Sequence, residues 1–231
     1  MRLYIANKNY SSWSLRPWVL MKHLGTAFEE VLVPFGPDAP QAFRAFSPTG
    51  KVPCLVDGNV TVWDSLAIVE YLAEREPAVW PRDDAARAWA RSASAEMHAG
   101  FAAVRHYCSM SCGLRVRLHP LPAAQAQELA SQWARIDALW CEGLSRFGGP
   151  FLAGSTFTAV DAFYAPVAFR ALTYSPELSA TAQAYVQRLL ELPAMRQWYQ
   201  EALDERWRDE PHEAEIQSLG EILSDLRRSA P

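Results

Sequence analysis

Two serines, Ser11 and Ser12, come directly before a helical pattern that begins near Trp13. The first backbone N–H groups of a helix have no partner within the helix and carry partial positive charge, so this position favours a bound anion. The serine hydroxyls add further hydrogen-bond donors. The alternative is that both serines serve only as helix N-caps, a common use of serine that is compatible with anion binding. The sequence therefore predicts an anion site to which the chain contributes no cysteine.

A second segment whose residues could bind a ligand covers residues 50–65, GKVPCLVDGNVTVWDS. Two short β-branched runs flank residues 57–59, where glycine supplies the positive φ that a tight hairpin turn needs. Val52-Pro53 precedes the hairpin, at a strand entrance where a cis peptide costs little. Asp64-Ser65 follows it, directly before a helical pattern over 65–74, and predicts a second helix N-terminus suited to an anion.

The composition narrows the class of protein. The chain has 231 residues, of which 50% are hydrophobic and 21% charged, with a net charge of −4. This is typical of a globular protein large enough for two small domains. The negative charge argues against a nucleic-acid surface, and no apolar run approaches the ~20 residues that cross a membrane. Four cysteines without a CxxC pair favour a reducing compartment, so we expect a cytoplasmic protein.

Hydrophobic periodicity places both segments in one small α/β unit. Strands are predicted at 2–6, at 28–33 and in the hairpin, and helices at 13–24, 41–46 and 65–74. The order β-α-β-α-β-β-α is that of a thioredoxin-like fold, whose functional loop follows the first strand and ends at a helix N-terminus. Such a position lowers the pKa of a thiol. Because this chain has no cysteine there, it can stabilise only the thiolate of another molecule.

From residue 77 onward, alanine-rich helical patterns replace the strands. We therefore predict a thioredoxin-like domain over 1–76, a linker over 77–83 and an all-α domain over 84–231. The predicted helices of the second domain are, in order, about 85–107, 122–146, 159–172, 180–190, 193–203 and 213–227.

Taken together, these motifs resemble those of the cytosolic glutathione transferases. Residues 11–16, SSWSLR, resemble the serine motif SSCSWR of the zeta class, which includes maleylacetoacetate isomerase. Residues 51–53 resemble the family's Val-Pro element, in which the proline is cis. Residues 64–68 resemble the acidic-residue-plus-serine element that holds the γ-glutamyl end of glutathione. Residues 157–163 resemble the family's buried capping box, a purely structural feature.

The resemblance implies glutathione as the co-substrate, without a metal, and it implies roles around the thiol. Ser11 is the expected hydroxyl donor to the glutathione sulfur, with Ser12 as the neighbouring candidate. Val52 is expected to pair its backbone N–H and C=O with the cysteinyl part of glutathione. Pro53, in cis, is expected to shape the strand-like edge at which Val52 pairs with glutathione.

The same resemblance assigns the two ends of glutathione. Lys51 is placed to meet the glycyl carboxylate as a point charge. Asp64 is expected to bind the α-amino group, and Ser65, at its helix N-terminus, the γ-glutamyl carboxylate. Taken singly, Lys51 and Asp64 are also consistent with solvated surface charges.

A small electrophile would then bind between the two domains. The candidates to line its pocket are Trp13, Arg105, Cys108 and Cys112, and the last three are spaced to share a face of one long helix. Trp13 is also consistent with core packing. His106 with the two cysteines lacks the usual four ligands of a closed zinc site, so no metal is expected.

The leading prediction is a glutathione S-transferase that activates the glutathione thiolate for attack on a small hydrophobic electrophile. We expect a homodimer, with the α/β domain of one chain against the helical domain of the other. One alternative is a glutathione-dependent isomerase of the maleylacetoacetate type, although Trp13 stands where the zeta class has cysteine. The other is a non-catalytic binding or regulatory protein, which would have no reason to keep both the serines and the γ-glutamyl element.

Overall fold

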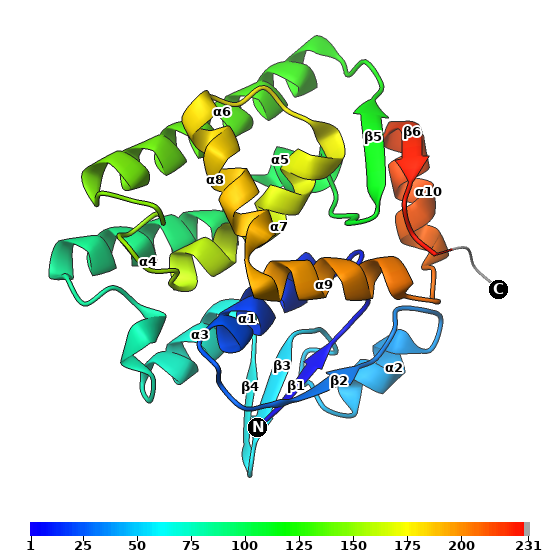
Figure 1. Ribbon diagram of the computed structural model, residues 1–231. Coiled ribbons are helices and arrows are strands. Elements are labelled where there is room, and N and C mark those ends of the chain that lie inside the picture. Colours follow the sequence, from blue (N-terminus) through cyan, green and yellow to red (C-terminus); the bar gives the residue numbers. More distant parts are fainter. Residues whose placement is uncertain (229–231) are drawn as a thin grey trace.

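The computed structural model describes residues 1–228 of the chain. Its first part is built on a four-stranded sheet with the strand order β2-β1-β3-β4 (Figure 1). The strands are β1 (Arg2–Ile5), β2 (Glu29–Leu32), β3 (Cys54–Asp57) and β4 (Val60–Trp63). The accompanying helices are α1 (Ser12–His23), α2 (Ala39–Arg44) and α3 (Ser65–Ala73). Since β1 is parallel to β2 and antiparallel to β3, the predicted thioredoxin-like order is confirmed.

The hairpin of β3 and β4 forms as its turn residues predict. Asp57 pairs with Val60, which leaves Gly58 and Asn59 as a two-residue turn. Gly58 has a φ of 60°, the positive value that a type II′ turn requires at its first central residue.

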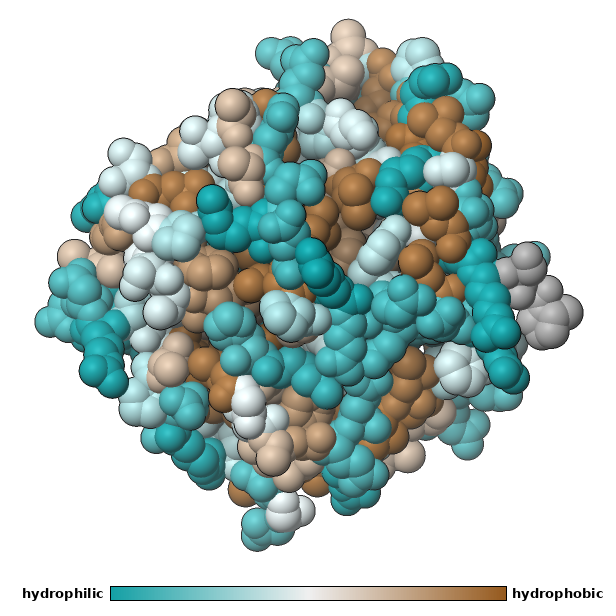
Figure 2. All heavy atoms as spheres, in the orientation of Figure 1, coloured by the Kyte–Doolittle hydropathy of each residue, from teal (hydrophilic) through white to brown (hydrophobic). Residues whose placement is uncertain are grey.

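The two faces of the sheet carry separate apolar clusters. Leu3 and Leu55 belong to the main core together with α1 and α3, whereas Ala6 packs with Ala39 and Phe43 of α2. Helices α1 and α3 therefore cover one face and α2 the other. On the side of the molecule shown in Figure 2, polar side chains are interspersed with apolar ones over both parts of the chain.

The second part of the chain is mainly helical. Its helices are α4 (Asp84–Ala99), α5 (Ala102–Tyr107), α6 (Ala123–Arg146), α7 (Ala159–Tyr174), α8 (Ala180–Glu191), α9 (Pro193–Asp204) and α10 (Glu210–Leu219). Nearly all of α7 is buried, because it packs against α1, α4 and α8 in the middle of the molecule (Figure 1). The predicted linker 77–83 contains the 3₁₀ turn η1 (Pro77–Val79) and ends where α4 begins. Its role as a domain boundary stays a prediction.

The capping box predicted at the start of α7 is confirmed. The backbone N–H of Thr158 donates to Asp161 Oδ2 at 2.9 Å. The other carboxylate oxygen accepts from the N–H of Leu152 at 3.0 Å and from the hydroxyl of Tyr185 at 2.8 Å. One buried carboxylate therefore joins the start of α7 to the preceding loop and to α8.

The prediction of one long helix over 85–107 was wrong. The helix is interrupted at Gly100 and Phe101, and Phe101 has a left-handed φ of 56°. A Cβ atom at Gly100 would lie 2.7 Å from the carbonyl oxygen of Glu96, so the chain can turn there only with glycine. The glycine was the available signal for this break.

The second part is helical as predicted, except for a two-stranded sheet that the sequence analysis missed. Strand β5 (Leu114–Leu118) pairs antiparallel with β6 (Gly220–Asp225), and β6 replaces the second half of the helix predicted at 213–227. The alternation of Leu114 and Val116 with arginines favours a strand, and both side chains pack on Ile216 of α10. This pairing brings the C-terminal segment next to the loop that follows α5.

Candidate active site

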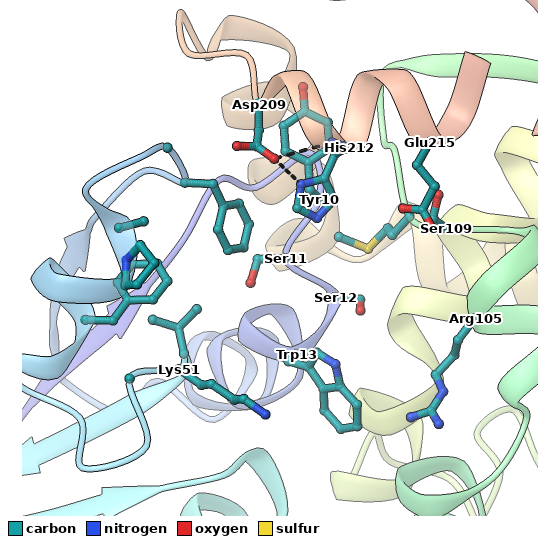
Figure 3. Close-up of a pocket in the computed structure, with 18 of the residues that line it drawn as sticks. Tyr10, Ser11, Ser12, Trp13, Lys51, Arg105, Ser109, Asp209, His212 and Glu215 are labelled. Atoms are coloured by element: carbon teal, nitrogen blue, oxygen red, sulfur yellow. Dashed lines mark hydrogen bonds and ion pairs between the residues drawn. The ribbon is translucent and has the colours of Figure 1, made fainter. Parts of the chain in front are cut away.

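A cavity of about 710 Å³ lies between the sheet part and the helical part of the chain (Figure 3). A smaller hollow of about 430 Å³ adjoins it, since Trp13, Lys51 and Val52 line both. We call the two together the site groove. Its combined size suits a small-molecule ligand.

The structure brings together every residue expected to contact glutathione. Ser11 and Ser12 line the larger cavity, and Pro53, Asp64 and Ser65 line the smaller hollow. The groove therefore runs from the start of α1 to the start of α3.

The two serines at the start of α1 differ in their hydrogen bonds. Ser11 donates its hydroxyl proton to Ser14 Oγ at 2.7 Å, and within residues 1–228 its side chain caps no backbone N–H group. Ser12 instead accepts a hydrogen bond from the Arg170 guanidinium at 3.3 Å. The Ser12 hydroxyl proton is thus left for a ligand, while that of Ser11 is already engaged. Because Ser11 does not cap α1, the first backbone N–H groups of this helix donate no bond to the Ser11 side chain and can donate to a ligand.

Arg170 is a functional candidate that sequence analysis missed. It lies on the otherwise apolar helix α7, is 3% exposed, and donates from Nε to the carbonyl oxygen of Cys108 at 2.8 Å. Among the described residues, it forms no ion pair with a carboxylate. Burial lowers the pKa of its guanidinium to about 10. The signal in the sequence was a lone arginine inside the apolar run 165–172, because a buried cation without an acidic partner is costly unless it serves a ligand.

Trp13 lies at the wall of the groove and is half-buried. The guanidinium of Arg16 lies 4.1 Å from the centre of its ring, and that of Arg105 lies 5.5 Å from it. Arg16 is 1% exposed and donates to Ser65 Oγ at 3.5 Å. Burial, together with the charges of Arg170 and Arg105, lowers the pKa of Arg16 to about 9. The start of α1 is therefore surrounded by cations, an environment that favours anionic ligands.

Lys51 and Val52 form the edge of the groove beside the sheet. The Val52-Pro53 peptide is cis. The pairing of β1 with β3 begins at Cys54, so Val52 lies just outside that ladder. Its backbone N–H and C=O are therefore placed to pair with an extended ligand. Lys51 is exposed, and its side chain points along the cavity in Figure 3.

The N-cap of α3 is Asp64, and Ser65 is the first residue of the helix. Asp64 has a φ of 76° and accepts from the N–H groups of Leu66 and Ala67 at 2.8 and 3.3 Å. Its second oxygen lies 3.3 Å from Nε2 of His98. Burial lowers the pKa of His98, although the nearby Asp64 opposes this effect. Ser65 is buried and keeps its hydroxyl next to Arg16.

The placement of Cys108 and Cys112 on a helix face with Arg105 was wrong, because α5 ends at Tyr107. The two cysteines are 1% and 0% exposed, and neither is among the residues that line the site groove. Burial raises the pKa of the Cys108 thiol to about 11 and raises that of Cys112 further. Cys112 donates to the carbonyl oxygen of Lys8 at 3.4 Å and so joins two parts of the core. Arg105, by contrast, does line the larger cavity.

The described residues show neither a metal-ion site nor a membrane-spanning helix. All four cysteines lie within the described residues and are free. Within residues 1–228, no three His, Cys, Asp or Glu side chains are grouped so that they could hold a metal ion. The same part of the chain contains no helix that is both long and apolar enough to span a bilayer.

The C-terminal helix α10 supplies a further wall that the sequence did not predict. Asp209, His212 and Glu215 line the larger cavity, opposite the sheet edge at Lys51 (Figure 3). They reach it only because β6 pairs with β5 and holds the end of the chain against the loop that follows β1.

Comparison with known proteins identifies the family of both parts. Residues 10–75 match the model for the glutathione S-transferase N-terminal domain, and residues 115–201 match the model for the C-terminal domain. "Glutathione S-transferase T1" of Arabidopsis thaliana is 27% identical over 158 residues, which cover 64% of each chain. This chain thus spans less than two thirds of that relative. "Probable maleylacetoacetate isomerase" of Caenorhabditis elegans is 25% identical over 83% of this chain and 89% of its own.

A solved structure shows the same fold over nearly its whole length. The theta class glutathione S-transferase from Xanthomonas axonopodis pv. citri, determined with glutathione bound, is 25% identical, with a TM-score of 0.63. The superposition covers 86% of this chain and 96% of that one. The two domain matches, their order and the shared fold show that this chain belongs to the glutathione S-transferase family.

Proposed function

We propose that this protein is a cytoplasmic glutathione S-transferase that binds glutathione in the site groove and activates its thiolate for attack on a small hydrophobic electrophile. The observation that carries the proposal is the meeting of the free Ser12 hydroxyl, the N-terminus of α1 and the buried cation of Arg170. Each of these favours a negative charge at the same point. The four free cysteines support the cytoplasmic location.

Glutathione would lie extended along the groove. Its cysteinyl backbone would pair with Val52, and its glycyl carboxylate would face Lys51. At the other end, Asp64 would bind the α-amino group, and the N-terminus of α3 would bind the γ-glutamyl carboxylate through Ser65. The buried Arg16, which contacts Ser65, supplies positive charge at that carboxylate.

The thiol would lie at Ser12. A free thiol has a pKa of about 8.5, so only a few per cent is thiolate at pH 7. Because Arg170 occupies an acceptor site of the Ser12 oxygen, the hydroxyl proton points elsewhere and is available to the sulfur. Arg170 thus acts as a positioning residue. The thiolate would then form a bond to the electrophilic carbon as the leaving group departs with its electron pair.

The electrophile would occupy the part of the larger cavity next to the serines. This part is lined by Trp13, Met110 and Arg105. The first two supply apolar surface, and Arg105 supplies a positive charge. An isomerase activity is a second candidate, because a relative named as a probable maleylacetoacetate isomerase aligns over most of its length. In that reaction the thiolate would add to a conjugated double bond and leave again after rotation. An assay with a cis-enone acid in the presence of glutathione separates the two activities.

The proposal is tested first by binding. The wild-type protein should be retained on immobilised glutathione and eluted by free glutathione. It should then conjugate glutathione with at least one member of a panel of aryl halides, enones and alkyl halides. Retention without turnover across the panel would favour the non-catalytic alternative, and absence of binding would refute the proposed function.

Asp64→Asn is expected to weaken glutathione binding by about 10- to 100-fold, because a charged hydrogen bond to the α-amino group contributes about 1.5–3 kcal/mol. Asparagine is a good N-cap and tolerates positive φ, so the variant keeps the cap of α3 while removing the charge. Calorimetric titration measures the dissociation constant, and an unchanged melting temperature verifies the cap. An unchanged dissociation constant would show that Asp64 does not bind the ligand.

We also propose a homodimer in which the α/β domain of one chain packs on the helical domain of the other. Val60 and Trp63, on the edge strand β4, are 40% and 43% exposed, and such apolar exposure on an edge strand favours an interface. Sedimentation at micromolar concentration should give twice the 25.9 kDa mass of the chain. A species of the single-chain mass would contradict the proposal.

A further inference from the structure

Helix α10 is joined by hydrogen bonds and ion pairs to Tyr10, just before α1. The Tyr10 hydroxyl donates to Glu213, and the Arg227 guanidinium forms ion pairs with both Glu213 and Asp225. Arg227 also donates to the Tyr10 oxygen at 3.1 Å, and its side chain is 3% exposed. This segment follows the part of the chain that matches the family models, which ends at residue 201. The wall that it adds to the site therefore lies outside the two segments that match the family models.

His212 is fixed on the side of α10 that faces the cavity. Its Nδ1 is hydrogen-bonded to Oδ2 of Asp209, a residue that is only 6% exposed. The imidazole stacks on Tyr10, with ring centres 4.9 Å apart, and contacts the Phe35 ring at a tilt of 34°, with ring centres 5.0 Å apart. In the described residues no group is hydrogen-bonded to its Nε2. Figure 3 shows the ring at the cavity wall, on the same side as Ser11.

An aspartate at Nδ1 keeps the imidazole proton on that nitrogen, which leaves Nε2 as a hydrogen-bond acceptor. The same carboxylate stabilises the imidazolium that forms when Nε2 takes up a proton. Imidazole is also the side chain whose ordinary pKa is closest to neutrality. The pair therefore has the properties of a general base in a cavity where a thiol must lose its proton.

The other ionisable groups near His212 are less suited to this task. Burial and the bond to Glu213 raise the pKa of Tyr10 far above neutrality. Burial opposes ionisation of Glu213, but hydrogen bonds from Arg227 and Tyr10 outweigh it and lower its pKa.

We propose that His212, oriented by Asp209, accepts the proton of the glutathione thiol. The S–H bond breaks, its electron pair stays on sulfur, and the proton forms a bond to Nε2, directly or through one water. The products are a thiolate at Ser12 and an imidazolium paired with Asp209. After the thiolate attacks, the imidazolium returns its proton to the leaving group or to solvent. This inference rests on the proposed function, since it requires glutathione in the groove.

The test measures where the thiol proton goes. Glutathione is titrated into the full-length protein at neutral pH in two buffers with different enthalpies of ionisation, and the difference gives the protons released per ligand. The thiolate is followed in parallel by its ultraviolet absorption. The key variant is His212→Asn, whose amide can still donate to Asp209 but which has no Nε2. Glu210→Gln is the matched control on the same helix, because Glu210 is exposed and does not line the cavity.

The wild type should form thiolate while releasing close to no proton, because the protein retains it. His212→Asn should either release up to about one proton per glutathione bound, or lose most of the thiolate absorption. Glu210→Gln should behave as the wild type. S-methylglutathione, which has no thiol proton, should bind the wild type and His212→Asn with affinities within about threefold of each other.

Other results would overturn the inference. If His212→Asn matches the wild type in proton release and in thiolate absorption, His212 is not the proton acceptor. If the variant weakens glutathione and S-methylglutathione equally with proton release unchanged, His212 is a binding or structural residue only. Failure of the wild type to bind glutathione would instead refute the proposed function itself, and this inference with it.

Discussion

Ser12→Ala is expected to raise the pKa of the bound glutathione thiol by about one to two units and to lower kcat/KM at pH 7 by about 10- to 100-fold. A hydrogen bond to a charged group contributes about 1.5–3 kcal/mol, and each pKa unit corresponds to about 1.4 kcal/mol. Glutathione affinity should change little, since most of the ligand lies along Lys51, Val52 and Asp64. Part of the lost activity should return as the pH rises, because the thiol then ionises without help. Thiolate absorption against pH and the pH–rate profile measure both effects.

Ser11→Ala is the matched comparison, because the two serines are adjacent and equal in size. Its hydroxyl proton is engaged by Ser14, so we expect a pKa shift well under one unit. A larger shift in Ser11→Ala than in Ser12→Ala would return the donor role to Ser11, the residue that the motif alone favoured. If neither variant shifts the pKa of the glutathione thiol, the backbone N–H groups of α1 stabilise the thiolate instead of a serine hydroxyl.

Asp161→Ala is expected to lower the melting temperature by about 10 °C. The change removes the acceptor of the three buried donors that lie within 3.0 Å of the carboxylate, namely the N–H groups of Leu152 and Thr158 and the hydroxyl of Tyr185. Each unsatisfied buried group costs about 1–3 kcal/mol, so a total near 4 kcal/mol is expected even if the effects are not additive. For a chain of this size, 1 kcal/mol corresponds to about 2–4 °C. Thermal unfolding followed by tryptophan fluorescence measures the shift.

Tyr185→Phe provides the graded control. It removes one of the three donors and leaves the carboxylate bonded to both N–H groups, so a loss of about 1–2 kcal/mol is expected. If Asp161→Ala melts within about 2 °C of the wild type, the carboxylate does not hold the start of α7 in place.

Much of the first part of the chain follows from local sequence. Apolar periodicity and the Gly58 turn are local signals, and they led to the correct order of strands and helices. The capping box of Thr158 and Asp161 was predicted for the same reason, since its partners lie three residues apart. Such features depend on φ, ψ and side-chain reach over a few residues, which the sequence encodes directly.

Two elements of the second part were predicted wrongly because local signals competed. The pattern over 85–107 is helical on both sides of Gly100, so apolar periodicity alone does not show that the helix stops at this glycine. The segment 220–225 is amphipathic in either conformation, and it becomes a strand because β5 offers it a partner about a hundred residues away in sequence.

The sequence by itself determined the family resemblance, the α/β order, and the two helix N-termini that line the site groove. Only the tertiary structure decided which serine hydroxyl is free, because the group that orients Ser12 is Arg170, 158 residues further along the chain. The same holds for the cavity wall that carries Asp209 and His212, which depends on the pairing of the C-terminus with β5. The physical reason is that protonation and hydrogen-bond roles are set by the nearest partners in space. Packing of segments far apart in sequence brings those partners together, and the spacing of residues along the chain does not encode them.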